Sequence, residues 1–156
     1  MRIRAYEPAD APALAQLRFR SVRLLAAGVY SDAQIAAWQP APERAEDVRA
    51  RHEDGRRSYV AVAGDGSLMG VTDLEADGHV DTLYIDPGFA RRGVARALLA
   101  HVEAVARRDG LSQLFTEASE VARPVFEASG WEVVKKREFA HRGVTLWNWA
   151  MEKSLA

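Results

Sequence analysis

The spacing of hydrophobic and polar residues changes from segment to segment along the chain. In the first third it predicts one strand followed by helices. Residues 2–6 alternate charged and apolar side chains, which is typical of a strand. Asp10 precedes a proline by two positions, a pattern that starts helices, and apolar residues recur behind it at helical spacing as far as Leu25. We expect Gly28 to end this helix and Ser31 to cap a second, shorter one.

The middle of the chain predicts antiparallel strands joined by tight turns. Residues 59–63 and 68–74 are mostly apolar and flank a Gly-Asp-Gly segment, the composition of a hairpin turn. Asp77 with the glycine behind it marks a second hairpin. Residues 79–85 then predict one strand, which ends before an Asp-Pro-Gly segment.

The last third predicts a crossover helix and a final hairpin. Apolar residues recur at helical spacing over 94–106, and a glycine follows as a stop signal. Residues 114–118 predict a short strand, 121–128 a short helix, and 131–134 with 144–151 a closing pair of strands. Hairpins around one strand-helix-strand crossover predict an α/β fold with a mixed, mostly antiparallel sheet and helices on both faces.

Composition narrows the class of protein. The 156 residues are 48% hydrophobic and 28% charged, as in a globular protein that dissolves in water, and we expect a single domain over residues 1–156. The chain has no cysteine, and no histidine pairs with carboxylates at the spacing of a metal site, so we expect no metal. The charged N-terminal residues lack the apolar core of a signal peptide, and no apolar run approaches the ~18 residues that cross a bilayer. We therefore expect a cytoplasmic protein without a membrane partner.

The charge balance argues against nucleic acid as a partner. Lysine and arginine number 21 against 22 aspartate and glutamate residues, a net charge of −1, and no aromatic residues are interleaved with the arginines. A cluster of arginines on the first predicted helix, Arg18, Arg20 and Arg23, is most simply its solvated face. Any ligand must then be recognised by local features.

One segment in the middle of the chain has the features of an anion site. A strand leads into a tight loop and then a helix, whose first backbone N–H groups lack partners and lie at the positive end of the helix dipole. Gly93 allows a ligand to approach the backbone, and Ala95 keeps the next turn small. Arg91, Arg92 and Arg96 add charge suited to phosphates. These residues alone leave open a helix start that binds nothing, and they match neither a P-loop nor a dinucleotide-binding turn.

This segment resembles the acyl-coenzyme A loop of the GNAT N-acetyltransferases, which has the pattern Q/R-x-x-G-x-G/A after a strand ending L-x-V. Here Ala90-Arg-Arg-Gly-Val-Ala follows Leu-Tyr-Ile85, so the glycine and the small residue match and Ala90 departs from the pattern. A second block, from Ser119 to Trp131, resembles the family's N-x-x-A-x-x-L/F-Y/F-E-x-x-G-F/W at the expected distance. The likeness spans the whole chain and is greatest to bacterial members with A-R-P-F-F-E-like and M-E-K-like blocks, whose substrates are mostly unassigned.

The resemblance implies a GNAT-like fold and acetyl-coenzyme A as co-substrate, with direct transfer of the acetyl group to a primary amine of a small molecule or peptide. The strand that ends at Ile85 is expected to splay from residues 114–118, with the pantetheine in the gap and a backbone N–H near Ile85 for the developing oxyanion. The residues expected to bind coenzyme A are Leu83, Tyr84, Ile85, Arg91, Arg92, Gly93, Val94, Ala95, Arg96, Ser119 and Phe126.

Three side chains are candidates for the base that deprotonates the amine. His79 and Asp81 are expected on the same strand face as Leu83, and Glu117 ends the neighbouring strand. We favour Glu117, because it lies near the place where the pantetheine sulfur should emerge. The alternative for each of the three is a surface or hairpin residue.

Position 126 changes the expected chemistry of the leaving group. The family pattern often has a tyrosine there, whose hydroxyl would protonate the departing thiolate, and Phe126 has no hydroxyl. Thr116 and Ser119 offer hydroxyls that act through water, although Ser119 is equally a helix cap. A thiol pKa of about 8.5 makes the thiolate a tolerable leaving group without an acid. Phe126 and Ala90 also leave open an alternative function, a catalytically idle acyl-coenzyme A-binding module.

The pocket for the acceptor amine has few signals in the sequence. Tyr30 and Trp38 are expected to line the acceptor pocket, as the resemblance implies for the helices after the first strand, with core packing as the alternative. The final strands of such a sheet offer an edge that allows a homodimer.

Overall fold

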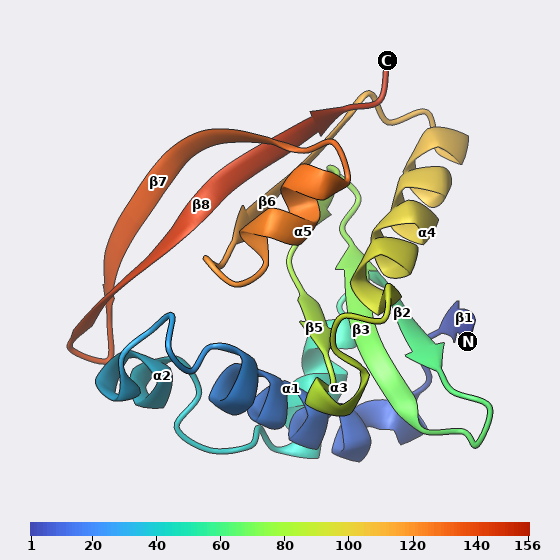
Figure 1. The fold of residues 1–156 in the computed structure, drawn as a ribbon. Coiled ribbons are helices and arrows are strands. Elements are labelled where there is room, and N and C mark those ends of the chain that lie inside the picture. The colour runs from blue at the N-terminus through green and yellow to red at the C-terminus, as the bar shows by residue number, and fades with distance from the viewer.

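Eight strands divide into two four-stranded sheets that diverge in the middle of the molecule (Figure 1). The computed structural model describes residues 1–156. The first sheet, in spatial order, consists of β1 (Arg2–Ala5), β2 (Arg57–Val62), β3 (Leu68–Leu74) and β5 (Leu83–Ile85). The second consists of β4 (His79–Val80), β6 (Gln113–Ala118), β8 (Val144–Ser154) and β7 (Glu132–His141). Every pair is antiparallel except β4 with β6, so the predicted mixed, mostly antiparallel topology is confirmed.

Helices cover both faces of the first sheet. The helices are α1 (Ala11–Leu25), α2 (Asp32–Trp38), α3 (Ala45–His52), α4 (Val94–Arg108) and α5 (Arg123–Ala128), with short 3-10 turns η1 (Pro8–Asp10) and η2 (Pro87–Phe89). Successive residues of a strand face opposite sides, so Val60 packs against α1 and α3 whereas Ala61 packs against α4. Helix α5 packs on the second sheet through Phe126, which joins a buried cluster with Leu114 and Met151.

The first two helices begin at the signals that the sequence predicts. Helix α1 starts directly after Asp10. Helix α2 is capped by Ser31, whose Oγ accepts the N–H of Gln34 at 3.1 Å while Gln34 Oε1 accepts the N–H of Ser31 at 2.8 Å. This reciprocal pair is a capping box, and it satisfies donors that a helix start otherwise leaves unpaired.

The single strand predicted over residues 79–85 is wrong, because the chain changes sheets within it. Residues 79–80 form β4 of the second sheet and residues 83–85 form β5 of the first. Asp73, a fully buried residue of β3, fixes the break: its Oδ1 accepts the N–H groups of Asp81 at 2.8 Å and Thr82 at 3.0 Å, and its Oδ2 accepts the Thr82 hydroxyl at 2.9 Å. The side chains of His79 and Leu83 therefore do not share one strand face.

This change of sheets creates the splay that the resemblance implies. Strand β5 pairs only with β3, so its other edge is free. Strand β6 pairs with β4 only as far as Thr116, and Glu117 and Ala118 extend beyond that pairing. The two free edges diverge toward α2 and the start of α4 (Figure 1).

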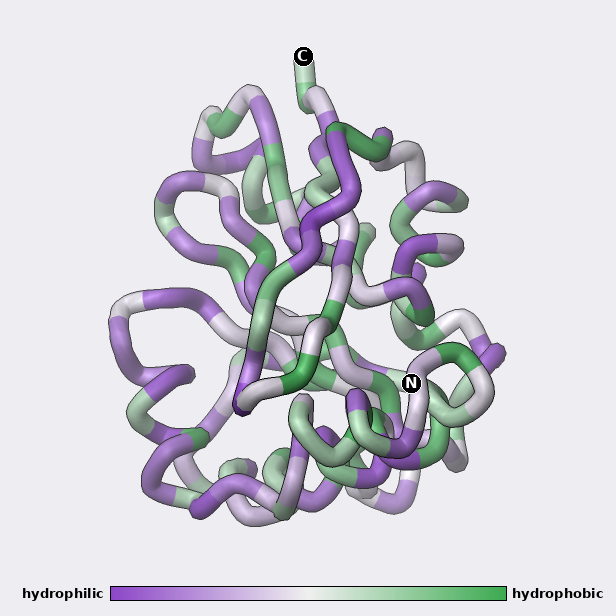
Figure 2. The backbone as a smooth tube through the Cα atoms, turned by 90° about the vertical axis from the view of Figure 1, so that its left-hand side faces the viewer, coloured by the Kyte–Doolittle hydropathy of each residue, from purple (hydrophilic) through white to green (hydrophobic).

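The closing hairpin is longer than predicted. Strands β7 and β8 of the second sheet extend to a turn at Arg142 and Gly143 and curve toward α2 (Figure 1). Most residues of β7 are exposed, so few apolar positions mark its length in the sequence. Short hydrophobic stretches are interleaved with hydrophilic ones along the whole backbone (Figure 2), and none of the helices has both the length and the apolar composition to span a membrane.

Candidate active site

A cavity of about 650 Å³ lies between the diverging sheets, beside the loop that precedes α4. Residues Leu83 to Ile85 of β5 form one side, and residues 119–125 form another. Helix α1 contributes apolar side chains, among them Val22 and Leu25, to the wall. The space between β5 and the segment that follows β6 is thus an accessible cavity with mostly hydrophobic walls.

The loop before α4 presents unpaired backbone donors. Arg91 and Gly93 both have left-handed backbone conformations, with φ of 59° and 79°. The N–H groups of residues 91–96 have no backbone acceptor, and a Cβ added to Gly93 would meet no atom within 4 Å. Successive N–H groups in turn conformations form an anion-binding concavity, and the dipole of α4 adds to it. A left-handed arginine costs roughly 1–2 kcal/mol, a strain typical of ligand-binding segments.

The arginines of this loop differ in position. Arg91 and Arg96 line the cavity together with Gly93 and Ala95. The side chain of Arg92 lies outside the cavity wall, with its guanidinium over the ring of Phe89 at 5.6 Å. Arg92 therefore stacks on Phe89, a residue that itself lines the cavity, and its expected contribution to coenzyme A binding stays a prediction.

A second cavity, of about 350 Å³, adjoins the first. Trp38, Tyr84 and Ser119 line both cavities, so the two spaces meet at these three residues. The second cavity lies among α1, α2, α3, the end of β6 and the β7–β8 hairpin. Its lining residues include the charged side chains Arg18, Arg51, Asp81, Glu117 and Arg137.

Tyr30 and Trp38 both line this second cavity, as the resemblance implies. The Tyr30 hydroxyl donates to the Trp147 carbonyl at 3.0 Å and accepts the Glu120 N–H at 2.9 Å, and its ring contacts Trp38 and Trp147 with centroids 5.5 and 4.3 Å away. Burial raises the pKa of the Tyr30 hydroxyl. Tyr30 therefore joins α2 to β8 and to the loop after β6, and it shapes the wall rather than supplying a free hydroxyl.

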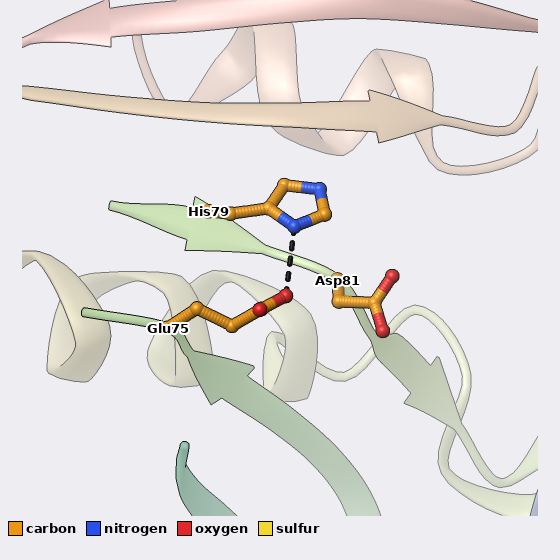
Figure 3. A group of neighbouring side chains, drawn as sticks. All are labelled: Glu75, His79 and Asp81. Atoms are coloured by element: carbon orange, nitrogen blue, oxygen red, sulfur yellow. Dashed lines mark hydrogen bonds and ion pairs between the residues drawn. The ribbon is translucent and has the colours of Figure 1, made fainter. Parts of the chain in front are cut away.

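His79 bridges two carboxylates beneath the second cavity. Its Nδ1 lies 2.8 Å from Glu75 Oε1 (Figure 3), and its Nε2 lies 2.9 Å from Glu117 Oε1. The hydrogen bond to Glu117 and, against the effect of burial, the one to Glu75 raise the pKa of His79 to about 9. At neutral pH the ring is therefore protonated and donates to both carboxylates, so the expectation of His79 as a base is corrected.

The two remaining base candidates, Asp81 and Glu117, line the second cavity. Asp81 Oδ2 accepts a hydrogen bond from Arg56 Nη1 at 2.8 Å, whereas Glu117 is held by His79. Glu117 lies two residues before Ser119, where the cavities meet. The structure thus places both carboxylates in the wall of the second cavity. Asp81 is paired with Arg56 and Glu117 with His79.

Glu75, His79 and Asp81 lie close together, with one ligand atom of each within 4.8 Å of the others (Figure 3). Their atoms already have partners: both ring nitrogens of His79 face carboxylates, and Asp81 faces Arg56. A metal ion at this cluster would have to displace the proton of His79 and compete with these ion pairs. The cluster is an ion-pair network around two cations, and it holds Glu117 in place.

The hydroxyl candidates separate into one inside the site and one outside. Thr116 is 4% exposed, its Oγ1 donates to the Val80 carbonyl at 2.7 Å, and it lines neither cavity. The expectation of a role for Thr116 is corrected, because this bond closes the β4–β6 pairing. Ser119 lines both cavities, and its Oγ accepts the Ala122 N–H at 3.1 Å, so it also acts as a cap.

Phe126 is a core residue. It is 2% exposed and packs edge to face against Trp131 with ring centroids 4.9 Å apart, and it lines neither cavity. The ring points into the buried cluster beneath α5, which supports the core reading, and the expected contact of Phe126 with coenzyme A stays a prediction.

Several residues of the second cavity are not marked by the sequence. Arg18 was expected in the solvated face of the first helix, but it lies in the cavity wall, 3.1 Å from Glu43 and 4.8 Å above the centre of the Tyr84 ring. Arg51 and Arg137 come from α3 and β7, far away in the sequence. No local pattern marks these arginines, since what distinguishes them is tertiary contact.

Known proteins similar to this chain fall in one family. A sequence profile described as Acetyltransferase (GNAT) domain matches residues 26–154. The uncharacterized N-acetyltransferase YafP of Escherichia coli (strain K12) is 32% identical over 152 residues, which make up 97% of this chain and 94% of YafP.

Solved structures with a similar fold include further N-acetyltransferases. A GCN5-related N-acetyltransferase (Aminotransferase, Class-II) from Rhodopseudomonas palustris superposes with a TM-score of 0.90 at 29% identity, covering 98% of this chain and 94% of the other. The PaiA N-acetyltransferase of Thermoplasma acidophilum, solved in complex with coenzyme A, has a TM-score of 0.74 at 21% identity, covering 98% of each chain. The resemblance inferred from the two sequence blocks is confirmed: the chain belongs to the GNAT family of N-acetyltransferases.

Proposed function

We propose that this protein transfers an acetyl group from acetyl-coenzyme A directly to the primary amine of a small molecule or peptide. The observation that carries the proposal is the meeting of two unlike cavities at Trp38, Tyr84 and Ser119. One is mostly apolar and ends at unpaired N–H groups, and the other contains carboxylates. This arrangement supports simultaneous binding of two substrates whose reacting atoms meet at the junction.

The first cavity suits acetyl-coenzyme A as co-substrate. The N–H groups of residues 91–96 and the side chains of Arg91 and Arg96 would bind the pyrophosphate. The free edge of β5 would pair with the pantetheine amides as an added strand does. The presence of coenzyme A in the similar Thermoplasma protein supports this assignment.

The geometry of β5 also supplies a donor for the acetyl oxygen. The N–H of Asp86 donates to the Met69 carbonyl of β3 at 2.9 Å. Successive N–H groups of a strand point to opposite edges, so the N–H of Ile85 points toward the gap between the sheets. A donor at that place would stabilise negative charge that develops on the carbonyl oxygen during attack.

Glu117 would act as the base. The amine nitrogen forms the new bond to the acetyl carbon as the thioester C–S bond breaks, and the proton lost by the amine passes to Glu117, directly or through water. His79 is a positioning residue, since its protonated ring holds the Glu117 carboxylate. Ser119 can donate a hydrogen bond from its hydroxyl to the departing thiolate, directly or through water, because its Oγ accepts from Ala122. The thiolate then leaves as such or takes a proton from solvent. Asp81 is the rival base.

An acceptor screen tests the proposal. The release of coenzyme A thiol is followed with acetyl-coenzyme A and a panel of primary amines, and calorimetry measures acetyl-coenzyme A binding in parallel. Amine-dependent thiol release with matching N-acetylated product is the expected result. Binding without thiol release with any amine would instead support the idle acyl-coenzyme A-binding module. The cytoplasmic location and the homodimer stay predictions.

A further inference from the structure

The second cavity has one wall rich in arginine. Arg18, Arg51 and Arg137 line it from α1, α3 and β7. Glu43 is the carboxylate among them: its Oε1 lies 3.1 Å from Arg18 and 2.9 Å from Arg51, and its Oε2 lies 2.6 Å from Arg51. Hydrogen bonding to Arg51 and the charge of Arg18 lower the pKa of Glu43 against the effect of burial, so it is ionised. Three guanidinium groups against one carboxylate leave an excess of two positive charges.

Several donors of these arginines have no partner in the protein. The Nε of Arg18 is buried and makes no hydrogen bond. Arg137 donates within the chain only from Nη1, to Asn148 Oδ1 at 3.0 Å. The buried Arg18 Nε is out of reach of a ligand, whereas the remaining donors of Arg137 lie on a residue of the cavity wall. Such donors suit a ligand with acceptor oxygens, and a guanidinium matches the planar geometry of a carboxylate.

The wall near β4 and the end of β6 has the opposite charge. Asp81 and Glu117 face the cavity, and further charged groups lie behind them. The ion pairs of this wall join the carboxylates of Asp54, Asp73, Glu75, Asp81 and Glu117 to the cations Arg56 and His79. Five carboxylates against two cations leave an excess of three negative charges, on the side where the proposed base lies.

We propose that the acceptor is an amino acid: a molecule with a primary amine for the Glu117 side and a free carboxylate for the arginine side. This inference rests on the proposed function and names its substrate class. Aromatic residues also line this cavity and suit the carbon skeleton; they are Tyr30, Trp38, Tyr84, Phe139 and Trp147.

The charge pattern separates this class from other amines. A diamine would place its second ammonium group against Arg51 and Arg137, where like charges repel. The lysine side chain of a peptide has no carboxylate of its own near its amine. A free amino acid has both charges in one small molecule, which matches a cavity of about 350 Å³.

Matched acceptor pairs test the proposal. Free α- and ω-amino acids are compared with their carboxamides, which keep the skeleton and the amine but lose the negative charge, and kcat/KM is measured by thiol release. Charge-assisted hydrogen bonds to arginine predict that the best amino acid exceeds its amide by at least about tenfold. Equal or better use of the amides overturns the inference while leaving acetyl transfer intact. If none of the amines supports thiol release, the proposed function itself is overturned.

Two variants link the preference to the arginine wall. Arg137→Gln should reduce the ratio of amino acid to amide by about tenfold, because it removes a guanidinium from the wall. Arg108→Gln is the matched control, since Arg108 is exposed at the end of α4 outside both cavities, and the ratio should not change. A ratio that is the same in Arg137→Gln and in the parent protein would contradict the assignment.

Discussion

The two cavities that meet at Ser119 are built from different parts of the polypeptide. The first depends on backbone: the free edge of β5, the unpaired N–H groups of residues 91–96, and apolar walls that many side chains provide equally well. The second depends on charged side chains from α1, α3, β6 and β7. A backbone site tolerates substitution, and this explains how Ala90 departs from the family pattern without removing a donor. A side-chain site changes with each residue, so under the proposed function specificity for the acceptor would arise there.

The largest effect on activity is expected at Glu117, the proposed base in the second cavity. Glu117→Gln should lower kcat by about 10²-fold or more, because a general base contributes 10²–10⁴-fold. Its affinity for acetyl-coenzyme A should not change, since Glu117 lines only the second cavity. Steady-state kinetics over a range of pH, together with calorimetry, measure both effects.

Asp81→Asn is the matched comparison for this prediction. If Asp81 only binds the acceptor, its loss raises KM and leaves the pH profile of kcat in place. If Glu117→Gln keeps the parental pH profile and Asp81→Asn flattens it, then Asp81 is the base and Glu117 only binds the acceptor.

The next largest effect is expected at the backbone site. Gly93→Ala should weaken acetyl-coenzyme A binding about tenfold, because the methyl group would enter the open space in which the pyrophosphate is expected to lie. The left-handed alanine itself costs roughly 1–2 kcal/mol of stability. Gly110→Ala is the control, since Gly110 has φ of 77° and open surroundings at the other end of the same helix. Both variants should lose similar stability, and only the first should lose affinity. Equal affinity of the two variants for acetyl-coenzyme A would show that the loop at Gly93 does not bind it.

A smaller effect concerns the support of Glu117. The pKa of His79 is raised to about 9, above its ordinary 6.5, so its stabilising charge is fully present below about pH 6.5 and is lost as the pH rises through about 9. The free energy of unfolding should favour the parent over His79→Gln by on the order of 2 kcal/mol near pH 6 and by much less near pH 10. Chemical denaturation at both pH values measures this difference. A gap that widens with pH would show that His79 is neutral in the folded protein.

The smallest effect on activity is expected at Phe126. Phe126→Tyr should leave kcat unchanged, because the ring lies in the core rather than in a cavity. A buried hydroxyl without a partner costs about 1–3 kcal/mol, so thermal unfolding should shift downward. A several-fold rise in kcat would show instead that the hydroxyl reaches the leaving thiolate.

The sequence predicted those parts of the fold and site that depend on local signals. Ser31 caps α2 because its partner Gln34 is three residues away, and the loop at Gly93 is recognisable because a strand, a glycine and a helix start follow one another within a short segment. The splay of β5 from the second sheet also followed from the resemblance and is confirmed.

The parts that sequence reasoning missed depend on distant contacts. The break at residues 81–82 exists because Asp73, an acidic residue inside an apolar strand, binds two N–H groups across the hairpin. That buried aspartate was the available signal for the change of sheets. Arg18 lies in the wall of the second cavity, where Glu43 and Tyr84 contact it from other segments, and helical periodicity alone places it with its solvated neighbours.

A crystal structure of the protein with acetyl-coenzyme A tests the meeting of the two cavities most directly. We expect the pyrophosphate on the N–H groups of residues 91–96, the pantetheine along the free edge of β5, and the thioester beside Ser119 and Tyr84, with the second cavity open beyond it. A thioester that lies outside this junction, or a pantetheine that does not pass between β5 and β6, would contradict the account.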